Sequence, residues 1–377
     1  MKLIDIETPA ALIDQRRMEG NIARMQGHLS SLGVRLRPHV KTSKCIEVAR
    51  AQQTAGAVGI TVSTLKEAEQ FFAAGFGDVL YAVCIVPDKL DRALALIRKG
   101  CTLTLLVDSV AAAEAVVAKG KAANQKFQVM IEIDSDGHRS GVQPEAPELI
   151  AIGKVLQQGG ATVKGVLTHA GSSYDLDTPA ALQALAEQER SLCVRAAERL
   201  RAAGIACPEV SIGSTPTAIA AQHLEGVTEV RAGVYVFFDL VMSNVGVCAP
   251  QDVALSVLTE VIGHQAEKGW VIVDAGWMAM SRDRGTQRQK IDYGYGAVCD
   301  FDGNMIDGLI VSGANQEHGI VSRRDGTADT GLIERFPIGT KLRILPNHAC
   351  ATGAQYPSYV AVSAAGDATP WPRFQGW

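Results

Sequence analysis

The feature that most restricts the fold of this sequence is a regular alternation of branched, apolar segments with amphipathic segments over the first two thirds of the chain. Eight segments have the length and the Val, Ile and Leu content of buried strands, with helical patterns between them. They are residues 34–41, 57–64, 78–85, 102–108, 127–134, 162–169, 208–213 and 229–236. Strands apolar on both faces are typical of a parallel sheet covered by helices. Eight such units predict a closed (β/α)8 barrel, and the count of eight argues against an open, doubly wound sheet.

Residues that start and stop helices lie where this reading requires them. Thr64 followed by Glu67 is the pattern of a capping box, and Thr178 before Pro179 is an N-cap with proline at the first helical position. Four glycines occupy predicted C-terminal caps: Gly56, Gly75, Gly100 and Gly204. The sequence therefore predicts where the helices between the strands begin and end, in addition to their periodic pattern.

The pattern changes after about residue 247. Short alternating segments separated by turn residues follow, with a hairpin signal at Asp302-Gly303. We therefore expect two domains, a barrel over residues 14–246 and an all-β domain over residues 247–377. Residues 1–13 could join the second domain, and the segment "AALID" could add a strand to it; the sequence leaves this open.

Composition excludes several classes of protein. The 377 residues carry 36 Lys and Arg against 40 Asp and Glu, a formal net charge of −4 without a run of like charge, so a nucleic-acid partner is not expected. Asp5 and Glu7 interrupt the place of a signal peptide, and no stretch of eighteen apolar residues occurs, so we expect a cytoplasmic protein without a membrane partner. Eight scattered cysteines without a C-x-x-C pair indicate reduced thiols.

The active site of such a barrel is expected at the C-terminal ends of the strands. In "RPHVKTSKC" (37–45) the first predicted strand ends in His39 and Lys41. If Lys41 points inward, so does His39, while Lys44 follows a helix cap at Thr42 or Ser43 and faces outward. Partial desolvation would lower the pKa of Lys41 and make its amine a nucleophile toward a carbonyl. The alternative is a solubilising lysine at the rim.

A second group of residues at the same rim has the chemistry of a phosphate site. Residues 211–217, "SIGSTPT", supply a glycine, hydroxyls and backbone N–H groups at a strand-to-helix junction, although such turns also serve as plain helix caps. With "RAGVY" (231–235) they match the phosphate site that many barrels form from their last two loops. A lysine that binds an aldehyde, beside a phosphate site, suggests pyridoxal 5′-phosphate (PLP).

Ten stretches together then make a specific resemblance. The chain resembles the fold-type III PLP enzymes, which join an alanine racemase-like barrel to a C-terminal β domain, and among them the D-serine dehydratase and D-threonine aldolase family. The stretches cover nearly the whole chain: "TPAALID", "RLRPHVKTSK", "GITVSTLKEAEQFFAAG", "EIDSDGHRSG", "LTHAGSSY", "GSTPT", "EVRAGVYVFFD", "DAGWMAMSRDRG", "GANQEHG" and "PNHACATGAQ".

The resemblance implies roles for individual residues. Lys41 would be the Schiff-base lysine and catalytic base, Arg139 would approach the phenolic oxygen of the cofactor, and His169 would lie against its pyridine face. Arg231 is in the position that alanine racemases direct at the pyridine nitrogen. The phosphate would be held by Ser214, Thr215, Gly233 and Val234, with Tyr174 and Tyr235 as neighbours.

"NHAC" (347–350) is a candidate metal site. His348 and Cys350 are two residues apart, so on a strand they would project from one face, and imidazole with thiolate suits Zn²⁺. Two ligands alone also describe a buried thiol beside an ordinary histidine. The resemblance implies a divalent ion here, Zn²⁺ before Mn²⁺ or Mg²⁺.

The pair also divides the family, because the resemblance implies His-x-Cys in dehydratases and His-x-Asp in aldolases. We therefore expect elimination of water from a D-3-hydroxy amino acid, of the D-threo-3-hydroxyaspartate or D-serine type, to a 2-oxo acid and ammonia, by a homodimer. The alternatives are an aldolase that forms glycine and an aldehyde, a non-catalytic PLP carrier and, less favoured, an alanine racemase.

The site for the distal group of the substrate stays open. A second carboxylate could be bound by one of three arginines in "SRDRGTQRQK": Arg282, Arg284 or Arg288. Arginines in a polar loop are often simply solvated. "QEHG" (316–319) places Glu317 and His318 either near the site or in a plain surface loop.

Overall fold

The structure is a computed structural model that describes residues 2–377, and its residues group into two compact units. The first, called here the barrel unit, comprises Arg24–Gly233 and Gly376–Trp377. The second, the β unit, comprises the residues up to Ala23 and Val234–Gln375. Helix α1 (Gln15–Ser31) passes from one unit into the other. The division expected from the sequence, at residues 14–246 and 247–377, stays a prediction.

The barrel unit contains the predicted parallel sheet of eight strands. Its order is β2 (Arg35–Leu36), β9 (Glu229–Val230), β8 (Glu209–Ile212), β7 (Thr162–Thr168), β6 (Gln128–Ile133), β5 (Thr102–Val107), β4 (Asp78–Cys84) and β3 (Ile60–Val62). A bridge between His39 and Thr61 joins its two ends. Two hydrogen bonds support the bridge, from Val40 N to Thr61 O at 2.9 Å and from Thr61 N to Pro38 O at 2.8 Å. The (β/α)8 prediction is confirmed.

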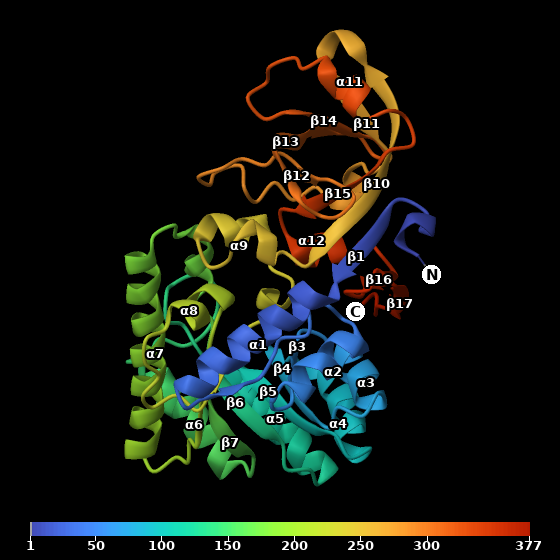
Figure 1. Cartoon of the computed structure of the whole chain (residues 1–377). Coiled ribbons are helices and arrows are strands. Elements are labelled where there is room, and N and C mark those ends of the chain that lie inside the picture. Colours follow the sequence, from blue (N-terminus) through green and yellow to red (C-terminus); the bar gives the residue numbers. More distant parts are fainter. Residues whose placement is uncertain (1) are drawn as a thin grey trace. The chain divides into compact units, whose positions relative to one another are not determined.

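Helices cover the outside of this sheet (Figure 1). They are α2 (Ile46–Thr54), α3 (Leu65–Ala73), α4 (Leu90–Arg98), α5 (Val110–Ala123), α6 (Pro147–Gln158), α7 (Pro179–Ala202) and α8 (Thr215–Ala220), with short 3-10 helices η2 (Pro87–Lys89) and η3 (Gly171–Asp175). The predicted caps are present: Thr64 and Thr178 accept hydrogen bonds from Glu67 N and Ala181 N. The four cap glycines all have positive φ, between 77° and 113°.

The interior of the barrel is filled by side chains from alternating strand positions. Leu80, Leu106, Met130 and Leu167, on four neighbouring strands, are buried in one cluster. Because side chains alternate along a strand, the residues two positions further on also point inward, at the C-terminal rim.

The first and last predicted strands are shorter than expected. Strand β2 ends at Leu36, but backbone hydrogen bonds to the β9 segment continue, from Arg37 N to Val230 O at 2.9 Å and from His39 N to Ala232 O at 2.8 Å. Pro38 has no backbone N–H to donate toward the β3 side, where the bridge between His39 and Thr61 follows. Residues 40–43 form a turn, in which Lys41 lies, and helix α2 begins after Cys45 rather than at Thr42 or Ser43. The last strand stops at Val230, and Val234–Val236 form the 3-10 helix η4.

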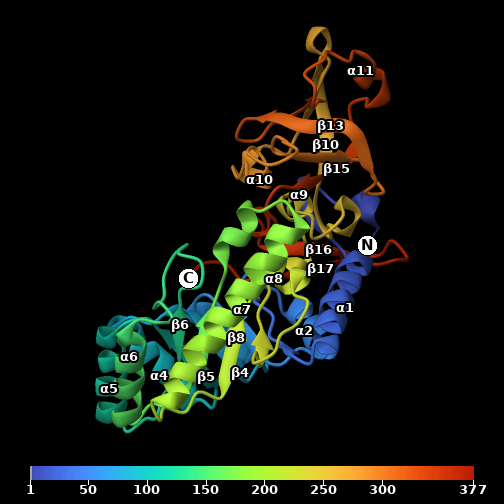
Figure 2. The ribbon, with the colours of Figure 1, turned by 90° about the vertical axis from the view of Figure 1, so that its left-hand side faces the viewer.

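The β unit is built on a mostly antiparallel sheet, shown in Figure 2 with β10, β13 and β15 crossing its upper part. The sheet order is β11 (Trp270–Val273), β14 (Gly319–Arg323), β13 (Met305–Ala314), β12 (Gly296–Cys299), β15 (Lys341–Pro346), β10 (Leu255–Gln265), β1 (Ala10–Asp14), β16 (Ser358–Val362) and β17 (Ala368–Pro372). Its other elements are α9 (Leu240–Val245), α10 (Trp277–Met280), α11 (Gly331–Arg335), α12 (Ala349–Gly353) and the 3-10 helices η1 (Leu3–Asp5), η5 (Pro250–Asp252) and η6 (Ala266–Lys268).

Strand β10 closes this sheet because it also pairs with β11, which makes a barrel of six strands. The segment "AALID" is strand β1, antiparallel to β10 and parallel to β16, which settles the question left open by the sequence. The predicted hairpin at Asp302-Gly303 joins β12 to β13, with Gly303 at φ 84°. Among residues 2–377, no helix combines the length and the apolar character needed to cross a membrane.

Gly213 tests the packing of the barrel. Its φ is 134°, and a Cβ atom there would clash with the backbone oxygen of Arg231. We expect Gly213→Ala to lower the free energy of unfolding, measured in urea, by about 3 kcal/mol. Gly160 is the matched control, since its φ is 88° and a Cβ would meet nothing within 4 Å. Gly160→Ala should cost only about 1 kcal/mol. Equal losses in the two variants would contradict this reading.

Candidate active site

The rim of the barrel collects inward-facing polar side chains from four strands. Asp108, Glu132 and His169 each lie two residues beyond a member of the interior cluster, and Cys84 lies four residues beyond Leu80, so the alternation of the strands aims all four at the C-terminal mouth. The rim is therefore polar above an apolar interior, as expected for the active end of such a barrel.

Lys41 is exposed and lies on the turn that follows the barrel-closing bridge, not at the end of a strand as expected; its partial desolvation stays a prediction. Its positive charge acts on two histidines. Burial and then the charge of Lys41 lower the pKa of His39 well below its usual value. Lys41 also contributes to the lowered pKa of His169. The amine thus lies beside two neutral imidazoles.

Lys44 does not face solvent as expected. Its side chain is only 15% exposed, and its Nζ lies 3.1 Å from Oε1 of Glu67, which is buried. Lys44 also adopts a left-handed backbone conformation, with φ 46°. Of the two lysines, the one predicted to be solvated is the more buried, because a carboxylate of helix α3 lies within reach of it.

His169 is held in one orientation at the end of β7. Its Nδ1 lies 3.0 Å from the carbonyl oxygen of Gly213, and its ring centroid lies 6.3 Å from that of Tyr174. Burial, opposed only by the hydrogen bond to Gly213, lowers the pKa of His169 to about 4. The sequence expectation placed Tyr174 as a neighbour of the cofactor, and the structure places it beside His169.

The predicted phosphate segment forms a compact, buried corner. The Ser214 side chain accepts a hydrogen bond from Thr217 N and lies 2.9 Å from the hydroxyl of Ser173. Ser214 and Thr215 are buried at the start of α8. A Cβ atom at Gly233 would lie 3.0 Å from Thr42 Oγ1 and 3.1 Å from His39 O. Gly233 thus packs against the Lys41 turn with no side chain between them, and the hydroxyls of Ser214 and Thr215 have the chemistry to bind the phosphate of PLP.

The two rim arginines differ in burial and in hydrogen bonding. Arg231 is buried and donates hydrogen bonds to Ser211 Oγ at 2.8 Å and Thr168 O at 2.6 Å, and burial lowers its pKa. Arg139 is largely exposed, and its guanidinium lies 3.7 Å from Glu132. Arg231 is therefore a cation fixed in the barrel wall by hydrogen bonds, whereas Arg139 is an exposed cation beside Glu132.

One group of residues at the rim was not predicted from the sequence. Cys84, Asp108 and Glu132 are the one trio of potential metal ligands that comes together among residues 2–377. The Cys84 thiol donates to Glu132 at 3.1 Å, and burial together with that carboxylate raises the pKa of Cys84. Their positions at the ends of three predicted strands were a usable signal.

Two predicted cofactor residues fall in the other unit. Val234 and Tyr235 are buried in the 3-10 helix η4, at the start of the β unit. Their expected roles stay predictions.

The candidate metal pair lies in the β unit, and on a helix rather than a strand. His348 is the N-cap of α12, and Cys350 is in its first turn. The two side chains still meet, because a hydrogen bond joins them. His348 Nδ1 lies 2.7 Å from Asp283 Oδ2, which leaves Nε2 for a metal. Burial would lower the pKa of His348, but Asp283 and Cys350 raise it to about 11.

This arrangement fits a metal ion, because a histidine ligand commonly binds a carboxylate through its second nitrogen. Asp283 is thus a functional candidate that the sequence did not identify, since it lies 65 residues before His348. Asp239 supports the same corner. Its carboxylate accepts hydrogen bonds from Met242 N and Ala349 N, and burial raises its pKa to about 6.

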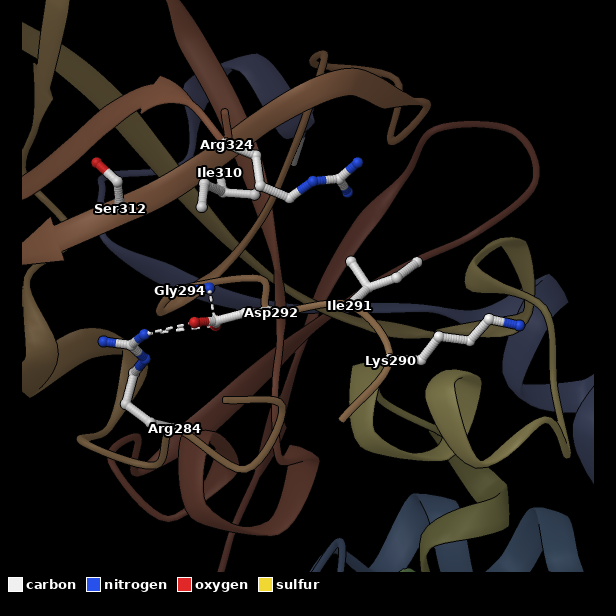
Figure 3. A pocket seen from close by; sticks show the side chains of 8 residues that line it. All are labelled: Arg284, Lys290, Ile291, Asp292, Gly294, Ile310, Ser312 and Arg324. Atoms are coloured by element: carbon white, nitrogen blue, oxygen red, sulfur yellow. Dashed lines mark hydrogen bonds and ion pairs between the residues drawn. The ribbon is translucent and has the colours of Figure 1, made fainter. Parts of the chain in front are cut away.

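The three loop arginines have different environments. Arg284 pairs with Asp292 at 3.1 Å and lines a cavity of about 420 Å³, whereas Arg282 lies over the ring of Trp277 and Arg288 is exposed. In Figure 3, Arg284 points at Asp292, whereas Arg324 and Lys290 extend away from it. Glu317 and His318 are exposed in the turn between β13 and β14, which is the surface-loop alternative.

Comparisons with known proteins agree with this two-part architecture. Residues 13–241 match the alanine racemase N-terminal domain, and residues 254–362 match the putative serine dehydratase domain. The chain is 66% identical to D-threo-3-hydroxyaspartate dehydratase of Delftia sp. (strain HT23) over 100% of this chain and 99% of the relative. A solved structure of that enzyme superimposes with a TM-score of 0.99, with 100% of each chain covered.

More distant relatives have two activities. D-serine dehydratase of Dictyostelium discoideum is 31% identical, over 95% of this chain and 94% of the relative. 3-Hydroxy-D-aspartate aldolase of Paracoccus denitrificans (strain Pd 1222) is 27% identical, over 98% and 92%. Two further solved structures, each of a D-threo-3-hydroxyaspartate dehydratase 65% identical to this chain, are a histidine-to-alanine variant and a cysteine-to-alanine variant, the latter in the metal-free form.

The low pKa of His169 can be measured by NMR in the cofactor-free protein. We expect its imidazole, assigned with His169→Gln, to titrate near pH 4 rather than near pH 6.5. Since the unfolded chain binds that proton first, the stabilising contribution of neutral His169 is present above pH 6.5 and is lost as the pH falls from about 6.5 toward 4. A midpoint near 6.5 would contradict the buried environment.

Asp283 can be tested as the partner of His348. We expect Asp283→Asn to weaken metal binding by about 10- to 100-fold, because a neutral amide orients and polarises the imidazole less. Competition with a chromogenic chelator measures the affinity. Asp292→Asn is the control, since Asp292 pairs with Arg284 on the same loop and should leave metal affinity unchanged.

Proposed function

Because the chain belongs to the family that joins an alanine racemase N-terminal domain to a serine dehydratase domain, we propose that it eliminates water from D-threo-3-hydroxyaspartate. The enzyme is a lyase of the dehydratase type that uses PLP and a metal ion. The observation that carries the choice of substrate is 66% identity over the whole chain to an enzyme named for it. The products would be a 2-oxo dicarboxylic acid and ammonia.

We propose that the barrel unit holds PLP. Lys41 would bind it through its ε-amine, and the buried corner of Ser214, Thr215 and Gly233 would receive its phosphate, with Val234 and Tyr235 adjoining. When bound, PLP supplies an electron sink for the negative charge that develops at the substrate α-carbon. Gly233 supports the assignment, because bare backbone there faces the turn that carries Lys41.

The residues of the barrel would also move the proton. The Lys41 amine would remove the α-proton, since an exposed amine on a turn can reach a substrate and can receive a proton once its own is lost. His169 stays neutral and fixed by Gly213 O, so it would present a flat, uncharged face. Arg139 and Arg231 would offset negative charge of the cofactor and the substrate.

In the β unit we propose that His348 Nε2 and Cys350 Sγ bind a Zn²⁺ ion. One nitrogen and one sulfur donor favour zinc over Mn²⁺ or Mg²⁺, which prefer oxygen. The two dehydratase variants support this choice, because the altered histidine and cysteine are two positions apart, as His348 and Cys350 are. When bound, the ion supplies a Lewis acid for the departing β-hydroxyl.

An aldolase is the second candidate. Its support comes from aldolase relatives, one of which is 27% identical to this chain, and Cys350 disfavours it. A non-catalytic PLP carrier is disfavoured, because residues 254–362 match the serine dehydratase domain. We also propose that the enzyme is a homodimer of the cytoplasm. All eight cysteines lie among the described residues and none of them forms a disulfide bond, which is consistent with a reducing compartment.

The experiment is a 2-oxo acid assay over a panel of D-amino acids. We expect D-threo-3-hydroxyaspartate to react with the highest kcat/KM, above D-serine and D-threonine. A chelator should abolish activity while the cofactor absorbance remains, and zinc should restore it. With D-threonine, 2-oxobutanoate indicates the dehydratase, whereas acetaldehyde would indicate the aldolase. PLP binding without turnover of any D-amino acid would indicate the carrier.

A further inference from the structure

The turn that carries Lys41 is fixed at its far end by Lys44. The backbone N–H of Lys44 donates to Val40 O at 2.8 Å, which closes a loop of one turn around Lys41. Lys44 has φ 46°, a left-handed conformation that is unfavourable for a residue with a side chain. A glycine or asparagine would satisfy this backbone more easily, so the backbone alone does not explain a lysine here.

The side chain of Lys44 provides a positive charge, which glycine and asparagine lack. Its Nζ lies 3.1 Å from Oε1 of Glu67, and the two side chains are 15% and 2% exposed. The other carboxylate oxygen of Glu67 accepts a hydrogen bond from Ser63 N at 2.9 Å. A carboxylate buried to this extent requires a cation, because an uncompensated charge in the interior is strongly unfavourable. The pair therefore ties the turn to the start of helix α3.

The anchored turn also borders the phosphate corner and the histidines. His39 O and Thr42 Oγ1 face Gly233, and His39 Nε2 lies 3.4 Å from the hydroxyl of Ser63, the residue held by Glu67. Movement of the turn would thus change the position of Lys41 relative to the surfaces that are proposed to hold the cofactor. Lys41 lies on this turn, so its backbone position follows that of the turn.

We propose that Lys44 and Glu67 are a positioning pair, which holds the turn so that the amine of Lys41 meets the aldehyde of PLP. The inference rests on the proposed function, in which Lys41 binds the cofactor covalently. Neither member of the pair takes part in the chemistry. Lys44 acts through the backbone of its turn, and Glu67 acts through Lys44.

The test compares the holoenzyme with the variant Lys44→Met/Glu67→Gln, which removes both charges, keeps the side-chain volumes and avoids an unpaired buried charge. We expect its PLP dissociation constant to rise about tenfold or more, and the pH midpoint of the cofactor absorbance to move. The single variant Lys44→Arg keeps the ion pair, so we expect its PLP dissociation constant and its pH midpoint to stay close to those of the wild type. The control is Arg92→Met/Glu69→Gln, which removes an exposed pair that also begins on helix α3 and should change neither value.

Unchanged affinity and an unchanged pH midpoint in the double variant would overturn the proposal. So would equal changes in the Arg92 and Glu69 control, because they would reflect a general loss of stability. If the double variant does not fold, Glu67→Gln alone serves, since its amide oxygen can still accept from Ser63 N; the same direction of change supports the proposal and no change overturns it.

Borohydride reduction and peptide mapping of the wild-type holoenzyme separate this proposal from the proposed function. Label on Lys41 supports the assignment of the cofactor lysine, whatever the variants show. Label on another lysine, Lys44 included, would overturn that assignment and the positioning role with it.

Discussion

Closure of the parallel sheet between its first and last members is the constraint on which the rest of the barrel unit depends. On the β3 side, where Pro38 has no N–H to donate, two backbone hydrogen bonds with Thr61 complete the closure. Arg37 strengthens the same segment, because its buried guanidinium lies 2.7 Å from Glu229 and 2.9 Å from Asp78. The turn that carries Lys41 follows this closing segment directly. The backbone contacts that close the barrel therefore also fix the position of that turn.

The residues at the rim of the barrel combine positive charges with neutral imidazoles. Lys41, Arg139 and Arg231 provide positive charge, while burial keeps His39 and His169 neutral beside them. A phosphorylated cofactor and an acidic substrate suit such a mouth. In the β unit the balance is reversed, since Asp283 and Cys350 favour a protonated His348 strongly enough to raise its pKa to about 11. A metal cation would replace that proton between the same donors.

Much of this was predictable from local patterns. Strand and helix periodicity predicted the (β/α)8 barrel, and the caps at Thr64 and Thr178 and the four cap glycines lie where their local chemistry placed them. The resemblance named residues that the structure brings together, such as His169 with Tyr174 and His348 with Cys350. The expected strand around His348 was wrong, because the spacing of two residues fits the first turn of a helix as well.

The sequence by itself determined which segments become strands and helices, and where chemically capable residues end them, because hydrophobic period and capping act over a few residues. Only the tertiary structure decided which of two lysines is buried, that Asp283 reaches His348, and that Cys84, Asp108 and Glu132 meet. These outcomes depend on partners tens of residues away along the chain. Burial and charge become defined for a side chain only when folding brings those partners within a few ångströms of it.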